Sequence, residues 1–121
     1  MMIEQRKALR LDTLARVTIK ELKEEEILLK DISVTGCRVE CPDETEIKLN
    51  NQYNVEISPE RGSKIEAFEL MAEPKWMNTG VNSLEIGLSI IQFPQGLQFQ
   101  HYVDYLAWRY SNGISITGEK I

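Results

Sequence analysis

Apolar and polar residues alternate with a period of two in several short segments, and this alternation most constrains the fold. Successive side chains of a β-strand point to opposite faces, so each such segment buries one face and exposes the other. Short stretches rich in charge, glycine or proline separate the segments and predict turns. The six predicted strands comprise residues 15–19, 27–33, 37–41, 53–57, 66–76 and 84–90. Six short strands are typical of a small antiparallel barrel, which leaves no exposed sheet edge.

The spacing of apolar residues becomes helical after Pro94. They recur at i, i+3, i+4, i+7 and i+11, which places them on one face of an α-helix. These residues are Phe99, Tyr102, Val103, Leu106 and Tyr110. Asn112 and Gly113 can end this helix, and we expect its apolar face to pack on the strands. Earlier, Pro74 near the end of the fifth strand predicts an edge position or a bulge.

A length of 121 residues suggests one domain with its own core. We expect an N-terminal arm over 1–12, a barrel with a C-terminal helix over 13–113 and a tail over 114–121. Hydrophobic residues make up 42% and charged residues 27%, as in soluble globular proteins. No apolar run approaches the roughly 18 residues of a membrane span, and the N-terminus is charged where a signal peptide is apolar. The sequence therefore predicts a cytoplasmic protein without membrane insertion.

A net charge of -5 disfavours binding to a nucleic acid polymer, because phosphate backbones require a basic surface. A small anionic ligand is compatible with it if positive charge is concentrated locally. Cys37 and Cys41 would lie roughly 13 Å apart on one strand, whereas a disulfide needs Cα atoms within about 7 Å. We expect both to be reduced and buried. His101 is the only histidine, so no metal site is expected.

The sequence does not favour an enzyme. It contains no nucleophile elbow, no phosphate-binding glycine loop and no cluster of metal ligands. His101 lies among polar residues of the predicted helix and is expected at its surface rather than as a general base. Carboxylates show no recognisable pairing by spacing, although a pair assembled by the fold stays possible. We expect no catalytic residue and no cofactor.

Two arginines in the segment RKALR, Arg6 and Arg10, are four residues apart. They share a face in a helical turn and lie roughly 13 Å apart in an extended arm. The planar guanidinium group suits bidentate bonds to a phosphate or to the O6/N7 edge of guanine. Two arginines at this spacing are also common on solvated surfaces, so the pattern alone is weak.

A second pattern, DISVTG, places Asp31, Ser33 and Gly36 at fixed offsets between two strands. An ionised carboxylate only accepts hydrogen bonds, and guanine presents adjacent N1–H and N2–H₂ donors that match it. The serine hydroxyl can donate to a phosphate oxygen, and glycine permits close backbone approach or a positive φ. The alternative is a local turn in which both side chains bond to nearby backbone groups.

Together the two patterns resemble the RxxxR and (D/N)xSxxG motifs of the PilZ family, with Asp31 lying 21 positions after Arg10. The later segment LEIGLSIIQF, with Gly87 between apolar residues, is similar to a strand of that family. The resemblance covers roughly residues 4 to 110. It implies a six-stranded barrel with a C-terminal helix that binds the bacterial second messenger cyclic di-GMP.

The resemblance also implies the ligand site. The five motif positions are Arg6, Arg10, Asp31, Ser33 and Gly36. The arginines would clamp guanine and phosphate from the arm, the aspartate would hold a guanine edge, the serine a phosphate, and the glycine the tight backbone. In the family, the residue before the first arginine influences whether one or two ligand molecules bind. Here that residue is Gln5, and the sequence is compatible with binding of either one or two ligand molecules.

Two functions of different classes follow. The first is a cyclic di-GMP receptor or adaptor, in which the ligand orders the arm against the barrel and the changed surface signals to an unidentified partner protein. The second is a PilZ-like interaction scaffold that binds its partner without the nucleotide. The complete motif favours the first function.

Overall fold

The computed structural model describes residues 10–22 and 26–113. Gln5 and Arg6 lie outside the described residues. Within the described part of the chain, no helix is both long and apolar enough to cross a bilayer. The elements are β1 (Leu11–Asp12), β2 (Arg16–Ile19), β3 (Ile27–Ile32), β4 (Gly36–Pro42), β5 (Tyr53–Ser58), η1 (Arg61–Ser63), β6 (Phe68–Thr79), β7 (Ser83–Gln92) and α1 (Gly96–Ser111).

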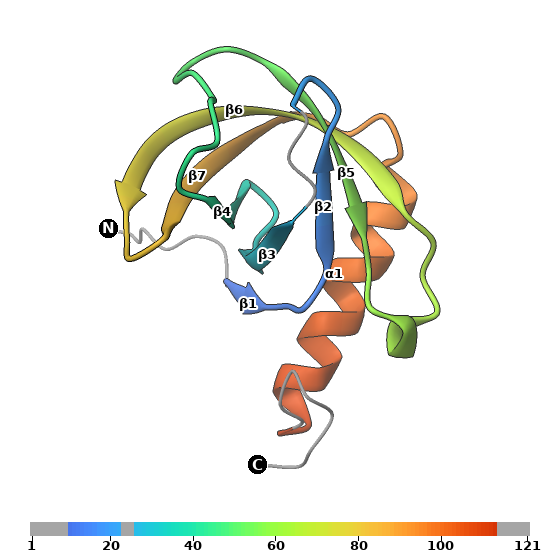
Figure 1. The fold of residues 1–121 in the computed structure, drawn as a ribbon. Coiled ribbons are helices and arrows are strands. Elements are labelled where there is room, and N and C mark those ends of the chain that lie inside the picture. Colours follow the sequence, from blue (N-terminus) through green and yellow to red (C-terminus); the bar gives the residue numbers. More distant parts are fainter. Residues whose placement is uncertain (1–9, 23–25, 114–121) are drawn as a thin grey trace, which may run out of the picture.

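Six antiparallel strands close into a barrel, as the alternating pattern predicted. Around the barrel their order is β3-β2-β5-β6-β7-β4, and β4 pairs again with β3. The two-residue strand β1 continues the edge of β2, because both pair with the same side of β3. Figure 1 shows the long, curved strands β6 and β7 wrapping around one side of the barrel, with α1 running downward behind β2 and β5.

The segment before β2 and the end of β6 differ from the sequence prediction in ways that affect the site. Leu11–Asp12, within the segment expected to be an arm, pairs with β3, and Leu11 is buried. β6 continues past Pro74 to Thr79 instead of ending at residue 76. The ladder between β6 and β7 shifts register between Pro74 and Trp76, so a bulge accommodates the proline within the strand. The predicted bulge is thus present, but it does not end the strand.

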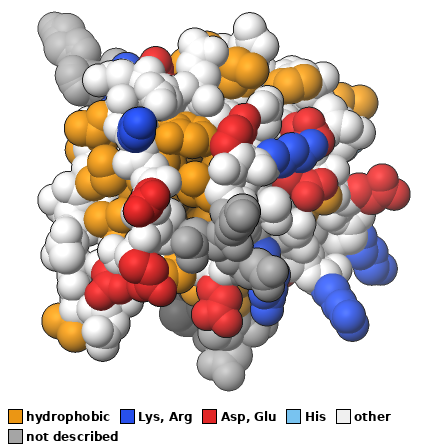
Figure 2. Space-filling view, turned by 45° about the horizontal axis from the view of Figure 1, so that its top comes forward, with side chains coloured by type: hydrophobic (Ala, Val, Ile, Leu, Met, Phe, Trp, Pro, Cys, Tyr) orange, Lys and Arg blue, Asp and Glu red, His pale blue; other side chains and the backbone are white. Residues whose placement is uncertain are grey.

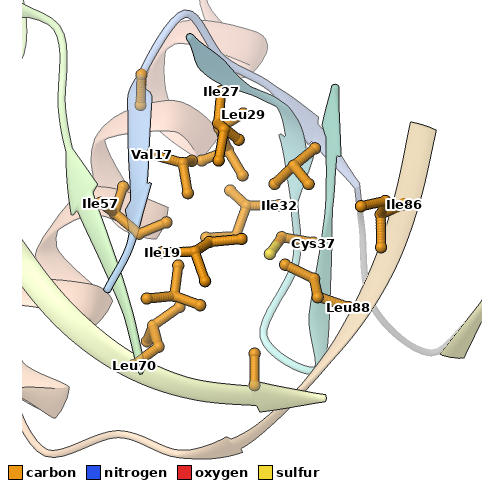
Figure 3. Close-up of a cluster of buried hydrophobic side chains, with 14 of the residues drawn as sticks. Val17, Ile19, Ile27, Leu29, Ile32, Cys37, Ile57, Leu70, Ile86 and Leu88 are labelled. Atoms are coloured by element: carbon orange, nitrogen blue, oxygen red, sulfur yellow. The ribbon is translucent and has the colours of Figure 1, made fainter. Parts of the chain in front are cut away.

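Inward-facing aliphatic side chains fill the barrel. Figure 3 shows side chains from the strands converging on one cluster. Its labelled members are Val17, Ile19, Ile27, Leu29, Ile32, Cys37, Ile57, Leu70, Ile86 and Leu88. Cys37 and Cys41 are both buried thiols, as predicted from their spacing. Burial raises the pKa of the Cys37 thiol to about 12, so the thiol stays protonated near neutral pH.

The helix α1 covers the barrel through an apolar face. Phe99, Tyr102, Val103 and Leu106 are buried on this face, as their spacing predicted. Phe68 of β6 packs against the rings of Phe99 and Tyr102, with centroids 6.1 and 5.9 Å away. Asn112 caps the helix, and Gly113 follows with a positive φ of 66°.

The last predicted position of the apolar face was wrong. Tyr110 is 66% exposed, whereas Arg109 is buried. Position 109 lies three residues after Leu106 and continues the buried face. Its long side chain places the guanidinium group at Glu60, where Nη1 donates to Oε2 at 3.3 Å. A charged residue can therefore occupy this position because the loop before η1 supplies the matching carboxylate.

Glu60 and Arg109 belong to a polar network that joins the helix to β1. The hydroxyl of Tyr102 donates to Oε1 of Glu60 at 2.7 Å and also bonds to the hydroxyl of Thr13. Thr13 in turn accepts a bond from the backbone N–H of Ala15 at 2.9 Å. The network fixes the chain just after β1 against the helix. Burial raises the pKa of the Tyr102 phenol, so it remains a proton donor.

We predict that Tyr102→Phe lowers the free energy of unfolding by about 1–3 kcal/mol, because buried partners lose their hydrogen bond. Tyr110→Phe is the matched control, and its exposed hydroxyl should change stability by less than about 0.5 kcal/mol. Urea unfolding followed by circular dichroism measures both values. Equal stability of the two variants would show that the network does not hold the helix in place.

Candidate functional site

Asp31 is the centre of the candidate site. Its Oδ1 accepts two hydrogen bonds from Arg10, from Nε at 3.1 Å and from Nη2 at 2.9 Å. Its Oδ2 accepts a hydrogen bond from Nε of Arg38 at 3.1 Å and forms an ion pair with Nη2 of Arg38 at 2.9 Å. Only 6% of Asp31 is exposed. Two guanidinium groups thus occupy both oxygens of one nearly buried carboxylate.

Strand pairing brings these three residues together. Asp31 of β3 lies directly opposite Arg38 of β4, on the same face of the sheet. On its other side Asp31 lies opposite Asp12 of β1. Arg10 precedes Asp12 by two residues, and such positions share a face in an extended chain. The short strand β1 therefore places Arg10 beside Asp31.

Ser33 and Gly36 form the turn between β3 and β4. The backbone N–H of Ser33 donates to the carbonyl of Gly36 at 2.8 Å. The serine Oγ lies 3.3 Å from the Gly36 carbonyl and accepts bonds from the N–H groups of Thr35 and Gly36, each at 3.3 Å. The buried serine thus makes the local turn bonds that were the alternative interpretation. Asp31 does not; its bonds go to the arginines.

Gly36 allows β4 and β7 to approach closely. A Cβ at this position would lie 2.6 Å from the backbone carbonyl oxygen of Leu88, which is too close for any side chain. Among the described glycines, Gly113 at the end of the helix has a positive φ, and Gly36 does not. Gly36 is therefore needed for its small size rather than for an unusual backbone conformation. The close approach that Gly36 permits is thus between the backbones of β4 and β7.

A pocket of about 740 Å³ opens over this part of the sheet. Its lining residues come from β3, β4, β6, β7, the turn between β3 and β4, and the segment before β1. They are Arg10, Asp31, Thr35, Gly36, Cys37, Arg38, Lys75, Trp76, Asn78, Glu85, Gly87, Leu88 and Ser89. Three cationic and two anionic side chains give the lining a net charge of about +1, against -5 for the whole chain. Positive charge is therefore concentrated at the pocket.

Figure 2 shows one face of the molecule, and the described side chains on that face form no extended basic surface. Among the described side chains there, acidic and basic groups are interspersed between uncharged ones. A long anionic polymer requires an extended basic surface. The lining of the pocket, by contrast, concentrates cationic side chains over a small area that can contact a small anion.

The structure brings together three of the predicted site residues and separates a fourth. Arg10, Asp31 and Gly36 line the pocket, while Ser33 is buried in the turn beneath and is not among the lining residues. The predicted contributions of Gln5 and Arg6 concern positions outside the described residues.

Sequence reasoning did not identify Arg38 and Trp76 as lining residues. Arg38 carried a usable signal, because counting outward from the Ser33–Gly36 turn pairs residue 32 with 37 and residue 31 with 38. Trp76 carried none, because its position depends on the register shift after Pro74. A bulge changes which residues face each other, and it cannot be counted from the turn.

Comparison with known proteins identifies the class. The PilZ domain profile matches residues 4–108, and the chain belongs to the PilZ domain family, whose members are cyclic di-GMP-binding domains. The chain is also similar to the solved structure of the Bacillus subtilis inhibitor of motility MotI/DgrA, with a TM-score of 0.74 and 17% sequence identity. The match covers 90% of this chain and 53% of that one, so this chain spans about half its length. No curated protein matches the sequence.

We predict that Gly36→Ala lowers the free energy of unfolding by about 1–3 kcal/mol, because the added methyl group forces β4 away from β7. Gly62→Ala is the matched control. There a Cβ meets only the Tyr105 hydroxyl, at 3.7 Å, and stability should change by less than about 0.5 kcal/mol. Thermal unfolding of both variants tests this. Wild-type stability of Gly36→Ala would mean that the strands tolerate a side chain here.

Proposed function

We propose that this chain is a cyclic di-GMP receptor that changes conformation on binding and signals to a partner protein. The observation that carries the proposal is Asp31, which holds two guanidinium groups at a positively charged pocket. The family assignment supports the ligand class. Arg10, Asp31 and Gly36 are its described contributors, and Ser33, Arg6 and Gln5 are proposed with them from the motif.

The chemistry of Asp31 supports guanine in particular. The N1–H and N2–H₂ groups of guanine present adjacent donors, in the same manner as the edge of an arginine side chain. A carboxylate that accepts paired N–H donors from arginine therefore has the geometry to accept a guanine edge. Adenine lacks these paired donors on its corresponding edge, and its affinity should be lower.

Ligand binding at this site requires an exchange of partners. Both oxygens of Asp31 are occupied, so a guanine edge must displace Arg10 or Arg38. The displaced guanidinium group becomes available to a phosphate or to the O6/N7 edge of guanine, for which it is well suited. Arg38 keeps a partner during this exchange, because its Nη1 also donates to Glu85 at 3.2 Å.

The exchange provides a route to a conformational signal. Arg10 directly precedes β1, and Thr13 directly follows it, bonded to Tyr102 of the helix. Movement of Arg10 therefore acts on a segment that contacts both the pocket and α1. We propose that the partner senses this segment or the arm before it. Catalysis has no role in the proposal, and the Cys37 thiol in the pocket is buried and protonated at neutral pH.

The direct test is calorimetric titration of the full chain with cyclic di-GMP, with GTP as the control. We predict binding of cyclic di-GMP that is at least about 10-fold tighter than binding of GTP, because a second base adds contacts. A flat titration of folded protein at high micromolar concentration would reject the receptor and favour the nucleotide-independent scaffold.

Arginine variants determine whether shape or only charge is recognised. Arg10→Lys keeps the charge but loses the planar fork, and it should weaken cyclic di-GMP binding ~10-fold or more. Arg16→Lys, at an exposed position on β2, is the matched control and should bind like the wild type. If Arg10→Lys also bound like the wild type, the guanidinium argument would be wrong even with the ligand correct.

A further inference from the structure

The helix α1 has a second face, directed away from the barrel, that carries a regular row of side chains. Leu97, His101, Asp104 and Trp108 follow one another at intervals of four, three and four residues, and all four are exposed. With about 3.6 residues per turn, this row lies almost opposite the buried face of the helix. Intervals that alternate between three and four are the pattern of contact positions in a helix that pairs with another helix.

The two ends of the row are large and apolar. Leu97 is 68% exposed and Trp108 is 56% exposed. A single exposed leucine is common on a protein surface, but two large apolar side chains in one row of a helix are what an interface between helices requires. The ring of Trp108 stacks on the ring of Tyr105, with centroids 6.5 Å apart, so a neighbouring ring supports it.

The two middle positions of the row have complementary chemistry. Asp104 carries a carboxylate, whose Oδ1 accepts a hydrogen bond from Gln100 of the same helix at 2.9 Å. His101 can donate a ring N–H to a carboxylate in either of its protonation forms. Asp104 is the only carboxylate of α1, whereas the whole chain has a net charge of -5. Two copies that meet through this face therefore bring few like charges together.

The row is complementary to itself when two copies of the helix run antiparallel. A two-fold axis between residues 102 and 103 places Leu97 against Trp108 of the second copy. The same axis places His101 against Asp104 of the second copy, and symmetry repeats each contact. A parallel pair would instead place Asp104 against Asp104 and bring the two carboxylates together. The row thus fits the antiparallel arrangement.

We propose that the outward face of α1 is a dimerisation surface, and that its occupant is the same face of a second copy of this chain, packed antiparallel. A single row of four side chains on each copy makes a small interface, so the dimer is weak and depends on concentration. The inference goes beyond the receptor function. Among the described residues, the pocket lining contains none from α1, so the dimer forms with or without the nucleotide.

Sedimentation equilibrium of the full chain without nucleotide measures the association directly. We expect the wild type to pass from monomer toward dimer between roughly 10 and 500 µM. Trp108→Ala should weaken the dimer at least about 10-fold, because each substitution removes two symmetric contacts. Tyr110→Ala is the matched control, since Tyr110 is an exposed aromatic residue of the same helix outside the row, and it should associate like the wild type. A wild type that stays monomeric throughout, or equal association of both variants, overturns the proposal.

The middle of the row supplies a second readout that a general loss of structure would not imitate. His101→Asp places carboxylates opposite each other across the axis and should weaken the dimer at least about 5-fold. Adding Asp104→His to the same chain exchanges the two roles and should restore wild-type association. Failure of the double variant to recover overturns the pairing of these positions.

Engineered cysteines test the direction of the helices, because the native Cys37 and Cys41 are buried. Chains with Leu97→Cys and chains with Trp108→Cys are mixed under oxidising conditions. We expect a disulfide-linked dimer in the mixture and none from either chain alone, since equal positions lie roughly 16 Å apart along an antiparallel pair. A linked dimer from either chain alone would contradict the antiparallel arrangement.

Discussion

The pairing register of β3, β4, β7 and β6 is the constraint on which the site depends. It places Asp31, Arg38, Gly87 and Trp76 opposite one another in a single row. Gly36 allows β4 to approach the backbone of β7, and Gly87 leaves room for the indole. Because side chains alternate between the faces, a slip of one residue in any of these pairings would move its side chain from the pocket into the barrel core.

The charge of Asp31 is balanced within the protein itself, by Arg10 and Arg38. Its carboxylate lies almost fully inside the protein, where an unpaired charge is costly, and the two arginines supply the compensating charge and hydrogen bonds. In the proposed function a ligand replaces these bonds. Its affinity then reflects the free-energy difference between the bonds that it makes with the protein and the Asp31–arginine bonds that it breaks. The same competition favours ligands that present paired donors to Asp31 and an anion to the released arginine. Guanine nucleotides carry both.

The sequence predicted the closed barrel because period-two alternation and short turns are local properties that the barrel preserves. Through a motif resemblance it also named Arg10 and Asp31 as ligand-site residues, and the structure shows that the two form an ion pair. It failed where long-range geometry decides. Arg109 replaces Tyr110 on the buried helix face because Glu60 lies nearby in space, and Trp76 reaches the pocket because a bulge shifts β6. Neither Glu60 nor the bulge register can be read from local periodicity.

The central claim is that the ligand displaces arginine from Asp31. Side-chain Nε–Hε resonances of the ¹⁵N-labelled full chain report this most directly during a cyclic di-GMP titration, since Arg10 and Arg38 both donate to Asp31 through Nε. We predict that the Nε–Hε resonance of at least one of them shifts with saturation, while that of Arg109, bonded to Glu60 on the helix, changes little. Saturable binding that leaves both Arg10 and Arg38 unchanged would contradict the account.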